Sequence, residues 1–246
     1  MVRRPPLLTN IYPQPILSVE VANKKPLYRE NLGPIQGMPN QWAIDATTFT
    51  LEGTRYLAYS GWPYGDTSDR KQALFIAPME DASHLDLERL PNGKPVMISS
   101  PQYPWEFSDG DHGVNEGPQF LTSPDGLWMG LVFSCAGSWT NEYKLAVLHY
   151  SGGDPLSTTS WHKDPHPLLQ STPGGQGPGP FGPGHGSFTQ VANGETVCVY
   201  HATNLPTEGW ANRRARCQRV VFQPDGAGPY MGNYVGRNVD LSLIHI

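Results

Sequence analysis

The chain has 246 residues and a net charge of −5; 27 residues are Gly, 25 are Pro, and only 16% are charged. This composition argues against a helical bundle, a coiled coil and charge-driven disorder, and it favours many tight turns. No basic tract extends beyond Arg213-Arg214-Ala215-Arg216, and no apolar run approaches the ~18 residues of a membrane span, so we expect neither nucleic acid nor a membrane as partner.

The two ends of the chain are expected to lie outside the folded domain. Prolines interrupt the apolar residues of 1–16, which argues against a signal peptide. We interpret residues 1–21 as a mis-predicted start, and residues 241–246 (Leu-Ser-Leu-Ile-His-Ile) as a translated sequencing adapter. The folded domain is then predicted to cover residues 22–240.

Alternating apolar and polar residues dominate the chain and predict an all-β protein. The best helical signal, Ala82–Leu90, is short. Three segments repeat one layout of strand, two-residue turn ending in Gly, and second strand. They cover residues 42–62, 115–139 and 184–204, with turns at Glu52-Gly53, Asp125-Gly126 and Asn193-Gly194. The period of about 70 residues exceeds the ~40–50 of small propeller repeats, yet it fits four-stranded propeller blades with long loops.

A titratable residue stands near the start of each repeat, at nearly the same distance before the turn glycine. These residues are Asp45, Glu116 and His185. Taken singly, each is more typical of a structural role: a cap, a loop carboxylate and a hydrogen-bonded histidine. The shared register changes this, because equivalent positions of successive blades converge at one end of a propeller axis. We therefore predict one site formed by all three.

Two carboxyl groups in one polar pocket suit glycoside hydrolysis. One carboxyl must be protonated to assist the departing oxygen, while another must be ionised. Like charges held close raise one pKa and can keep that acid protonated near neutral pH. Trp62 and Trp139 follow the second strands of their repeats and offer flat faces to a sugar ring. Packing in the core is the alternative role for both.

Other motifs give weaker evidence for a function. Ser108–Gly113 faintly resembles a calcium loop but lacks its further ligands, and residues 171–186 are a Gly/Pro-rich loop without the Lys of a phosphate loop. The three cysteines form neither a disulfide framework nor a metal-ligand pattern. One disulfide between two of them is possible. We predict that Cys135 is a small core residue.

Over residues 25–235 the sequence resembles glycoside hydrolase family 43, and within it the exo-α-1,5-L-arabinofuranosidases. The motifs that carry the resemblance are Trp42-Ala-Ile-Asp45, Tyr56-Leu57, Ser60-Gly-Trp62, Val114-Asn-Glu-Gly-Pro118, Phe133-Ser-Cys-Ala-Gly-Ser-Trp139, Gly184-His-Gly-Ser187, Tyr200-His-Ala-Thr203 and Arg213-Arg214. The resemblance implies a five-bladed β-propeller that hydrolyses arabinan or arabino-oligosaccharides with inversion at the anomeric carbon.

It also implies roles for single residues. Glu116 matches the general acid, and Asp45 matches the acid that tunes its pKa and orients the sugar. Among residues expected to bind substrate, Arg213 or Arg214 matches an arginine that contacts the sugar, and Ser134 lies in a shared motif. His185 matches an axial histidine near a bound ion such as calcium; no other cofactor is expected.

The sequence departs from the family in two ways. Residues 1–44 contain no Asp, and their only acids are Glu20 and Glu30, so the general-base Asp has no counterpart. At about 70 residues per repeat the chain holds three to four blades, not five. We therefore expect an incomplete propeller of impaired activity, from a parent that is secreted and monomeric when complete. A non-catalytic sugar-binding propeller, a protein-binding scaffold and a xyloside-cleaving relative are the alternatives.

Overall fold

A computed structural model describes residues 33–171 and 179–232. The chain divides into two units, residues 1–32 and 33–246, and every described residue belongs to the second. The predicted start segment 1–21 and the predicted adapter 241–246 lie outside the described residues. No described helix is long and apolar enough to cross a membrane.

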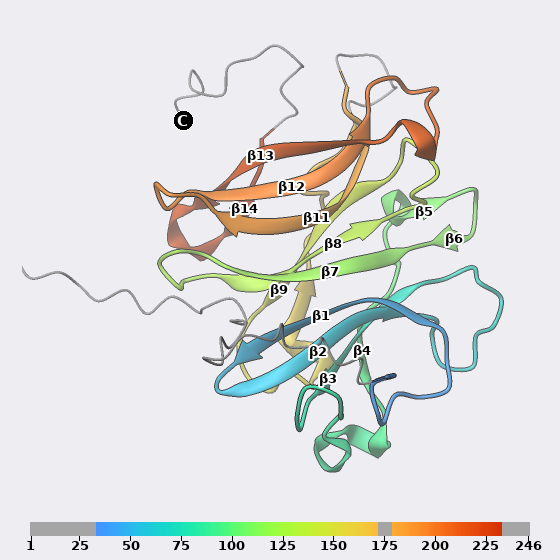
Figure 1. Cartoon of the computed structure of the whole chain (residues 1–246), viewed down its shortest axis with the longest axis vertical. Coiled ribbons are helices and arrows are strands. Elements are labelled where there is room, and N and C mark those ends of the chain that lie inside the picture. Colours follow the sequence, from blue (N-terminus) through green and yellow to red (C-terminus); the bar gives the residue numbers. More distant parts are fainter. Residues whose placement is uncertain (1–32, 172–178, 233–246) are drawn as a thin grey trace, which may run out of the picture. The chain divides into compact units, whose positions relative to one another are not determined.

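The described residues form three four-stranded antiparallel sheets, each a meander of consecutive strands (Figure 1). The first sheet comprises β1 (Ala43–Leu51), β2 (Thr54–Gly61), β3 (Ala73–Pro78) and β4 (Val96–Ser99). The second comprises β7 (Asn115–Thr122), β8 (Met129–Cys135), β9 (Lys144–Tyr150) and β10 (Trp161–Lys163). The third comprises β11 (Phe181–Gln190), β12 (Thr196–Thr203), β13 (Arg214–Gln223) and β14 (Gly228–Tyr230). These sheets are three blades of an incomplete β-propeller, as the repeats predict.

The first two sheets are connected by the 3₁₀ turn η3 (Pro104–Glu106) and the hairpin of β5 (Phe107–Ser108) and β6 (His112–Gly113). Further 3₁₀ turns lie between consecutive strands of one sheet: η1 (Leu87–Arg89), η2 (Pro91–Gly93), η4 (Thr158–Ser160), η6 (Trp210–Asn212) and η7 (Pro224–Gly226). The helix predicted over Ala82–Leu90 is wrong: only η1 forms there. Pro91 disfavours helical backbone at the residue before it, and Leu85 is already engaged in a β-bridge to Met79.

All three predicted hairpins are present, but only the first has the predicted two-residue turn. Glu52 and Gly53 both have positive φ, of 49° and 78°, which is the backbone of a type I′ turn. The second and third hairpins have longer connections, 123–128 and 191–195. In the second, the side chain of Ser123 accepts a hydrogen bond from the Trp128 N–H at 2.9 Å. This side chain thus takes the place of a backbone acceptor in the connection.

Two hydrophobic cores separate the blades. The first lies between sheets one and two and includes Phe75, Leu131 and Phe133; the second lies between sheets two and three and includes Val132 and Cys198. Successive residues of β8 thus enter opposite cores, because side chains alternate along a strand. This burial on both faces explains why β8 is almost continuously apolar. Cys135 is fully buried in the first core, as predicted, and the three cysteines are free.

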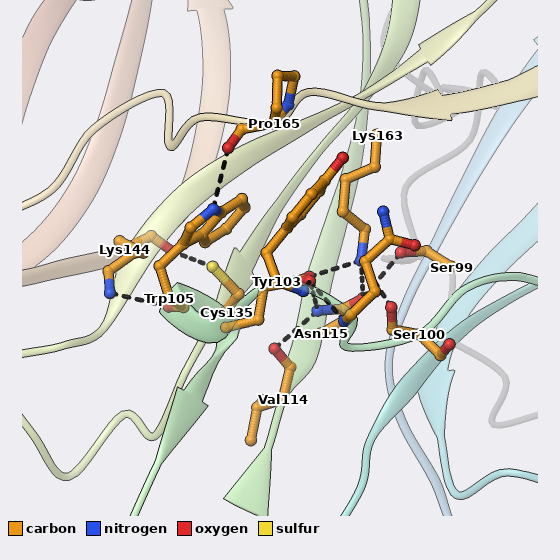
Figure 2. A network of polar contacts seen from close by, with 12 residues as sticks. Ser99, Ser100, Tyr103, Trp105, Val114, Asn115, Cys135, Lys144, Lys163 and Pro165 are labelled. Atoms are coloured by element: carbon orange, nitrogen blue, oxygen red, sulfur yellow. Dashed lines mark hydrogen bonds and ion pairs between the residues drawn. The ribbon is translucent and has the colours of Figure 1, made fainter.

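A buried ion pair belongs to a network of polar contacts that joins Lys163, Asn115 and Ser99 (Figure 2). Lys163 Nζ lies 2.5 Å from Glu106 Oε1, and both side chains are almost fully buried. The lysine also donates to the carbonyl oxygen of Ser100 at 2.7 Å and to Asn115 Oδ1 at 3.1 Å. Burial lowers the pKa of Lys163, while the partner carboxylate opposes this shift.

Asn115 connects this ion pair to the strand that carries Glu116. Its Nδ2 donates to Glu106 Oε1 at 2.7 Å, and its Oδ1 accepts from the hydroxyl of Ser99 at 2.7 Å. Its backbone carbonyl accepts from the hydroxyl of Ser60 at 2.8 Å. Since Ser60 and Ser99 belong to the first sheet, the network fixes the start of β7 against its neighbour.

We expect Lys163→Met to destabilise the fold by about 3–5 kcal/mol, because it leaves the Glu106 carboxylate buried without its cation. Urea unfolding followed by Trp fluorescence measures the change. The control is Arg70→Met, which breaks the exposed pair with Asp111; that variant should unfold as the unmodified protein does. Equal midpoints for both variants would contradict a structural role for the buried pair.

Candidate active site

The three titratable residues predicted to meet do lie together. Asp45, Glu116 and His185 each offer one ligand atom, and these atoms all lie within 4.8 Å of one another. They come from β1, β7 and β11, the first strands of the three sheets, which lie next to one another (Figure 1). The site therefore exists only where three blades meet.

Each of these residues lies at a β-bulge. The register between first and second strand shifts at Ile44/Thr47, at Glu116/Gln119 and at Gly184/Ser187, so that in each case two residues oppose one. The first extra residue has positive φ every time: 55° at Asp45, 58° at Gly117 and 52° at His185. A bulge of this kind bends the strand and redirects side chains.

The expectation that all three residues occupy equivalent positions needs a correction. Asp45 and His185 are equivalent, but the third equivalent residue is Gly117, and Glu116 stands one place earlier. A Cβ at Gly117 would lie 3.2 Å from Nδ1 of His185, a tight contact, and the positive φ of Gly117 also favours glycine. The second blade brings its carboxyl to the site from the neighbouring position, Glu116.

Asp45 and His185 adopt a backbone conformation that is uncommon for residues other than Gly. Such strain persists where the surrounding structure enforces it, and it concentrates at functional sites. For His185 the constraint is visible: its backbone N–H donates to the hydroxyl of Ser134 at 2.7 Å. Ser134 is fully buried, so the structure places this predicted substrate-binding residue behind the site, where it holds His185.

Glu116 is buried, and this sets its chemistry. Only 9% of the residue is exposed, and Oε1 accepts a 2.6 Å hydrogen bond from the hydroxyl of Tyr143. Burial, and secondarily the negative charge of Asp45, raise the pKa of Glu116. The Tyr143 hydrogen bond and the positive charges of His185 and Arg213 act in the opposite direction. The net effect favours the protonated acid.

Two residues that the sequence did not single out complete the site. Tyr143 is fully buried, and a Cβ at Gly184 would lie 2.1 Å from its ring, so only glycine fits there. The Tyr143 ring stacks on His201, with centroids 5.6 Å apart and planes at 11°. His201 belongs to the Tyr200–Thr203 motif and could have been found there, whereas nothing in the sequence marks Tyr143.

His201 orients the predicted arginine. Its Nε2 lies 3.0 Å from Nη1 of Arg213. Burial, followed by the charges of Arg213 and His185, lowers the pKa of His201 to about 4. The ring is therefore neutral near pH 7 and accepts a hydrogen bond from the guanidinium. Arg214 instead donates to the backbone carbonyl of Arg213, and of these two arginines it is Arg213 whose charge acts on Glu116.

The two predicted tryptophans lie on loops at this end of the sheets. Trp62 follows β2 directly and stacks on Trp42, with centroids 5.4 Å apart. Trp139 lies further along, within the loop between β8 and β9, and is 48% exposed. Their positions after the second strand are similar but not equivalent. Neither lies in the hydrophobic cores.

Asp45, Glu116 and His185 are also a possible set of metal ligands. Calcium takes six to eight oxygen ligands, so two carboxylates and one imidazole supply only part of its shell. Oε1 of Glu116 is already bonded to Tyr143. Asp45 Oδ2, in contrast, is buried and has no hydrogen-bond partner within the described ranges. An axial calcium ion stays a prediction.

Comparison with known proteins adds to this geometry. The model of the family "Glycosyl hydrolases family 43" matches residues 24–227. An extracellular exo-alpha-(1->5)-L-arabinofuranosidase of Streptomyces avermitilis is 31% identical over 201 residues, covering 79% of this chain and 38% of that protein. Alpha-L-arabinofuranosidase 43 of Humicola insolens is 29% identical over 202 residues, covering 79% and 39%. The chain thus spans about two fifths of the length of these relatives.

Among solved structures, an alpha-L-arabinofuranosidase from Lactobacillus brevis superimposes with a TM-score of 0.71 at 28% identity. The match covers 85% of this chain and 61% of that one. A thermostable family-43 glycoside hydrolase at 24% identity has a TM-score of 0.60 and supports the fold alone.

We expect Tyr143→Phe to raise the pKa of Glu116 further, because the lost hydroxyl is a donor that favours the carboxylate. Carbon-detected NMR titration of the glutamate side chains measures this. Tyr56→Phe is the matched control, since Tyr56 of β2 is also buried but its hydroxyl accepts from Arg89 of η1, away from the site. A Glu116 pKa that is unchanged or lower in Tyr143→Phe would contradict the assigned hydrogen bond.

Proposed function

The chain belongs to glycosyl hydrolases family 43, and on this premise we propose that it forms part of an enzyme that hydrolyses α-L-arabinofuranosidic bonds. The proposed substrates are arabinan and arabino-oligosaccharides. The names of the similar proteins from Streptomyces avermitilis and Humicola insolens support this substrate class. The first of these is named extracellular, which supports secretion of the parent protein.

The observation that carries the proposal is a buried Glu116, with a raised pKa, beside a second carboxylate. Hydrolysis of a glycosidic bond requires an acid that protonates the departing oxygen. Burial and the Asp45 charge raise the pKa of Glu116 and so prepare it for this role near neutral pH. Oε1 is held by Tyr143, which leaves Oε2 as the oxygen that delivers the proton.

Asp45 acts as the residue that tunes Glu116 and orients the sugar. Acid and base of an inverting glycosidase stand about 6.5–9.5 Å apart, so that a water molecule fits between them and the sugar. Asp45 and Glu116 offer atoms within 4.8 Å, which is too close for that pair. Asp45 Oδ2 is buried and has no hydrogen-bond partner within the described ranges.

The general base then lies outside this cluster. Within the described part of the chain the cluster holds two carboxylates and one imidazole, and both carboxylates already have roles. We propose inversion at this site, which requires a separate base that activates water on the opposite face of the sugar ring. Arg213, held by neutral His201, supplies fixed donors to the sugar hydroxyls.

We expect the Glu116→Gln variant of the parent protein to turn over arabino-oligosaccharides roughly 10²–10⁴ times more slowly. This is the usual contribution of acid–base catalysis. An aryl arabinofuranoside with a good leaving group should lose much less, because its oxygen needs little protonation. Glu195→Gln, the same change at an exposed ion pair with Arg219, is the control. Full activity of Glu116→Gln on the oligosaccharide would exclude Glu116 as the acid.

The stereochemistry of the product tests the assignment of Asp45. With inversion, proton NMR of a short reaction should detect β-arabinofuranose first, before mutarotation mixes the anomers. First release of the α-anomer would instead identify Asp45 as a nucleophile, because close carboxyl pairs are typical of retaining enzymes.

A further inference from the structure

A buried tryptophan joins the second and third sheets at the end opposite the active site. Trp128 stands directly before β8, and the start of β8 lies away from Glu116, because the end of this strand pairs with the start of β7. The Trp128 ring belongs to the second hydrophobic core, and its centroid lies 6.0 Å from that of Phe222 in β13. Trp128 is therefore one of the residues that hold the two sheets together.

The indole N–H of Trp128 is bound to a titratable acceptor. Its Nε1 donates to Nδ1 of His149, in β9, at 2.8 Å. An indole nitrogen can only donate, so Nδ1 carries no proton while this bond exists. The neutral ring then carries its proton on Nε2, which faces Asp164 Oδ2 at 3.4 Å. His149 thus accepts from one neighbour and presents an N–H to another.

The third sheet packs directly on this bond. A Cβ at Gly228 of β14 would lie 3.0 Å from Nε1 of Trp128 and 3.2 Å from Cε1 of His149. The φ of 113° at Gly228 also favours glycine. The backbone of β14 therefore contacts the indole and the imidazole together, and it senses the orientation of both rings.

The charged surroundings of His149 contain one carboxylate that faces its ring, that of Asp164. His162 of β10 lies opposite His149 in the strand register, and His166 donates its backbone N–H to Asp164 Oδ1 at 2.8 Å. Neither β8 nor β14 contains a charged residue or a histidine. Asp125, in the connection before Trp128, accepts hydrogen bonds within its own loop, and Arg219 of β13 has its own carboxylate partner.

We propose that His149 acts as a pH switch at the contact between the second and third sheets. The neutral ring holds Trp128 against β14, and the protonated ring releases it. The added proton binds to Nδ1, the atom that accepts from the indole, so two N–H groups then face each other and the hydrogen bond is lost. Asp164 favours the charged ring. The His149 side chain is 25% exposed, so solvent can supply the proton.

The switch affects the active site because of what the third sheet carries. His185 and His201 lie on β11 and β12, and Arg213 lies directly before β13. Histidine is the side chain that ordinarily changes its charge between pH 5 and 8. Mild acidification therefore weakens, from the far end of the sheets, the contact that supports these residues.

NMR of the chain between pH 4 and 8 tests the switch. The indole N–H signal of Trp128 should shift with pH, at the same midpoint as the ring nitrogens of His149. In His149→Gln the side-chain oxygen can accept from the indole at every pH, so this shift should disappear. His162→Gln, the same change at the exposed neighbour, should leave it in place. Asp164→Asn should move the midpoint to lower pH, because it removes the carboxylate that favours the charged ring.

Hydrogen exchange of the β13–β14 amides is a second readout that a purely structural histidine would not change. Corrected for the intrinsic effect of pH, exchange should become faster below the midpoint in the unmodified chain and not in His149→Gln. A Trp128 signal that does not titrate, or that still titrates in His149→Gln, would overturn the proposal. If that variant does not fold, the unmodified chain decides: a neutral His149 ring protonated at Nδ1 excludes the switch.

Discussion

The burial of Glu116 is the constraint on which the site depends. A carboxylic acid keeps its proton near neutral pH only where water is largely excluded or a second negative charge is close. No single antiparallel sheet provides such a place for a residue on its first strand. Here the meeting of β1, β7 and β11 provides both conditions, since the adjacent blades cover Glu116 and the first blade supplies Asp45.

The precision of this arrangement comes from polar groups beneath it. Asn115, the residue before Glu116, is bound to both members of a buried ion pair and to two serines of the neighbouring sheet. On the other side, Tyr143 fits against the bare backbone of Gly184 and contacts both Glu116 and His201. The Glu116 carboxyl is thus positioned from two blades at once, while its own strand bulges directly after it.

Much of the fold could be predicted from the sequence, and for a clear reason. Hairpin turns and strand alternation are local, so the three repeats and the convergence of Asp45, Glu116 and His185 followed from their spacing. What could not be predicted depends on contacts between blades. The one-residue offset of Glu116 places Gly117 against the His185 ring, a contact between two blades that the spacing within one repeat does not reveal. Tyr143 becomes important only because β11 passes over it. Ala82–Leu90 failed as a helix because nearby β-bridges and Pro91 outweigh a weak local preference.

The meander order of the strands also determines when the site comes into being. Every sheet joins strands that are consecutive in the chain, so each forms by closing short loops, which costs little entropy. During synthesis the first and second blades can fold as soon as they emerge, and they bring Asp45 and Glu116 together. The remaining parts of the site form only with the third blade. They are His185, the contact of Tyr143 with Gly184, and the Arg213–His201 pair. The complete arrangement of the site is therefore a late event in folding, and a chain halted before β11 would hold Asp45 and Glu116 without the residues that order them.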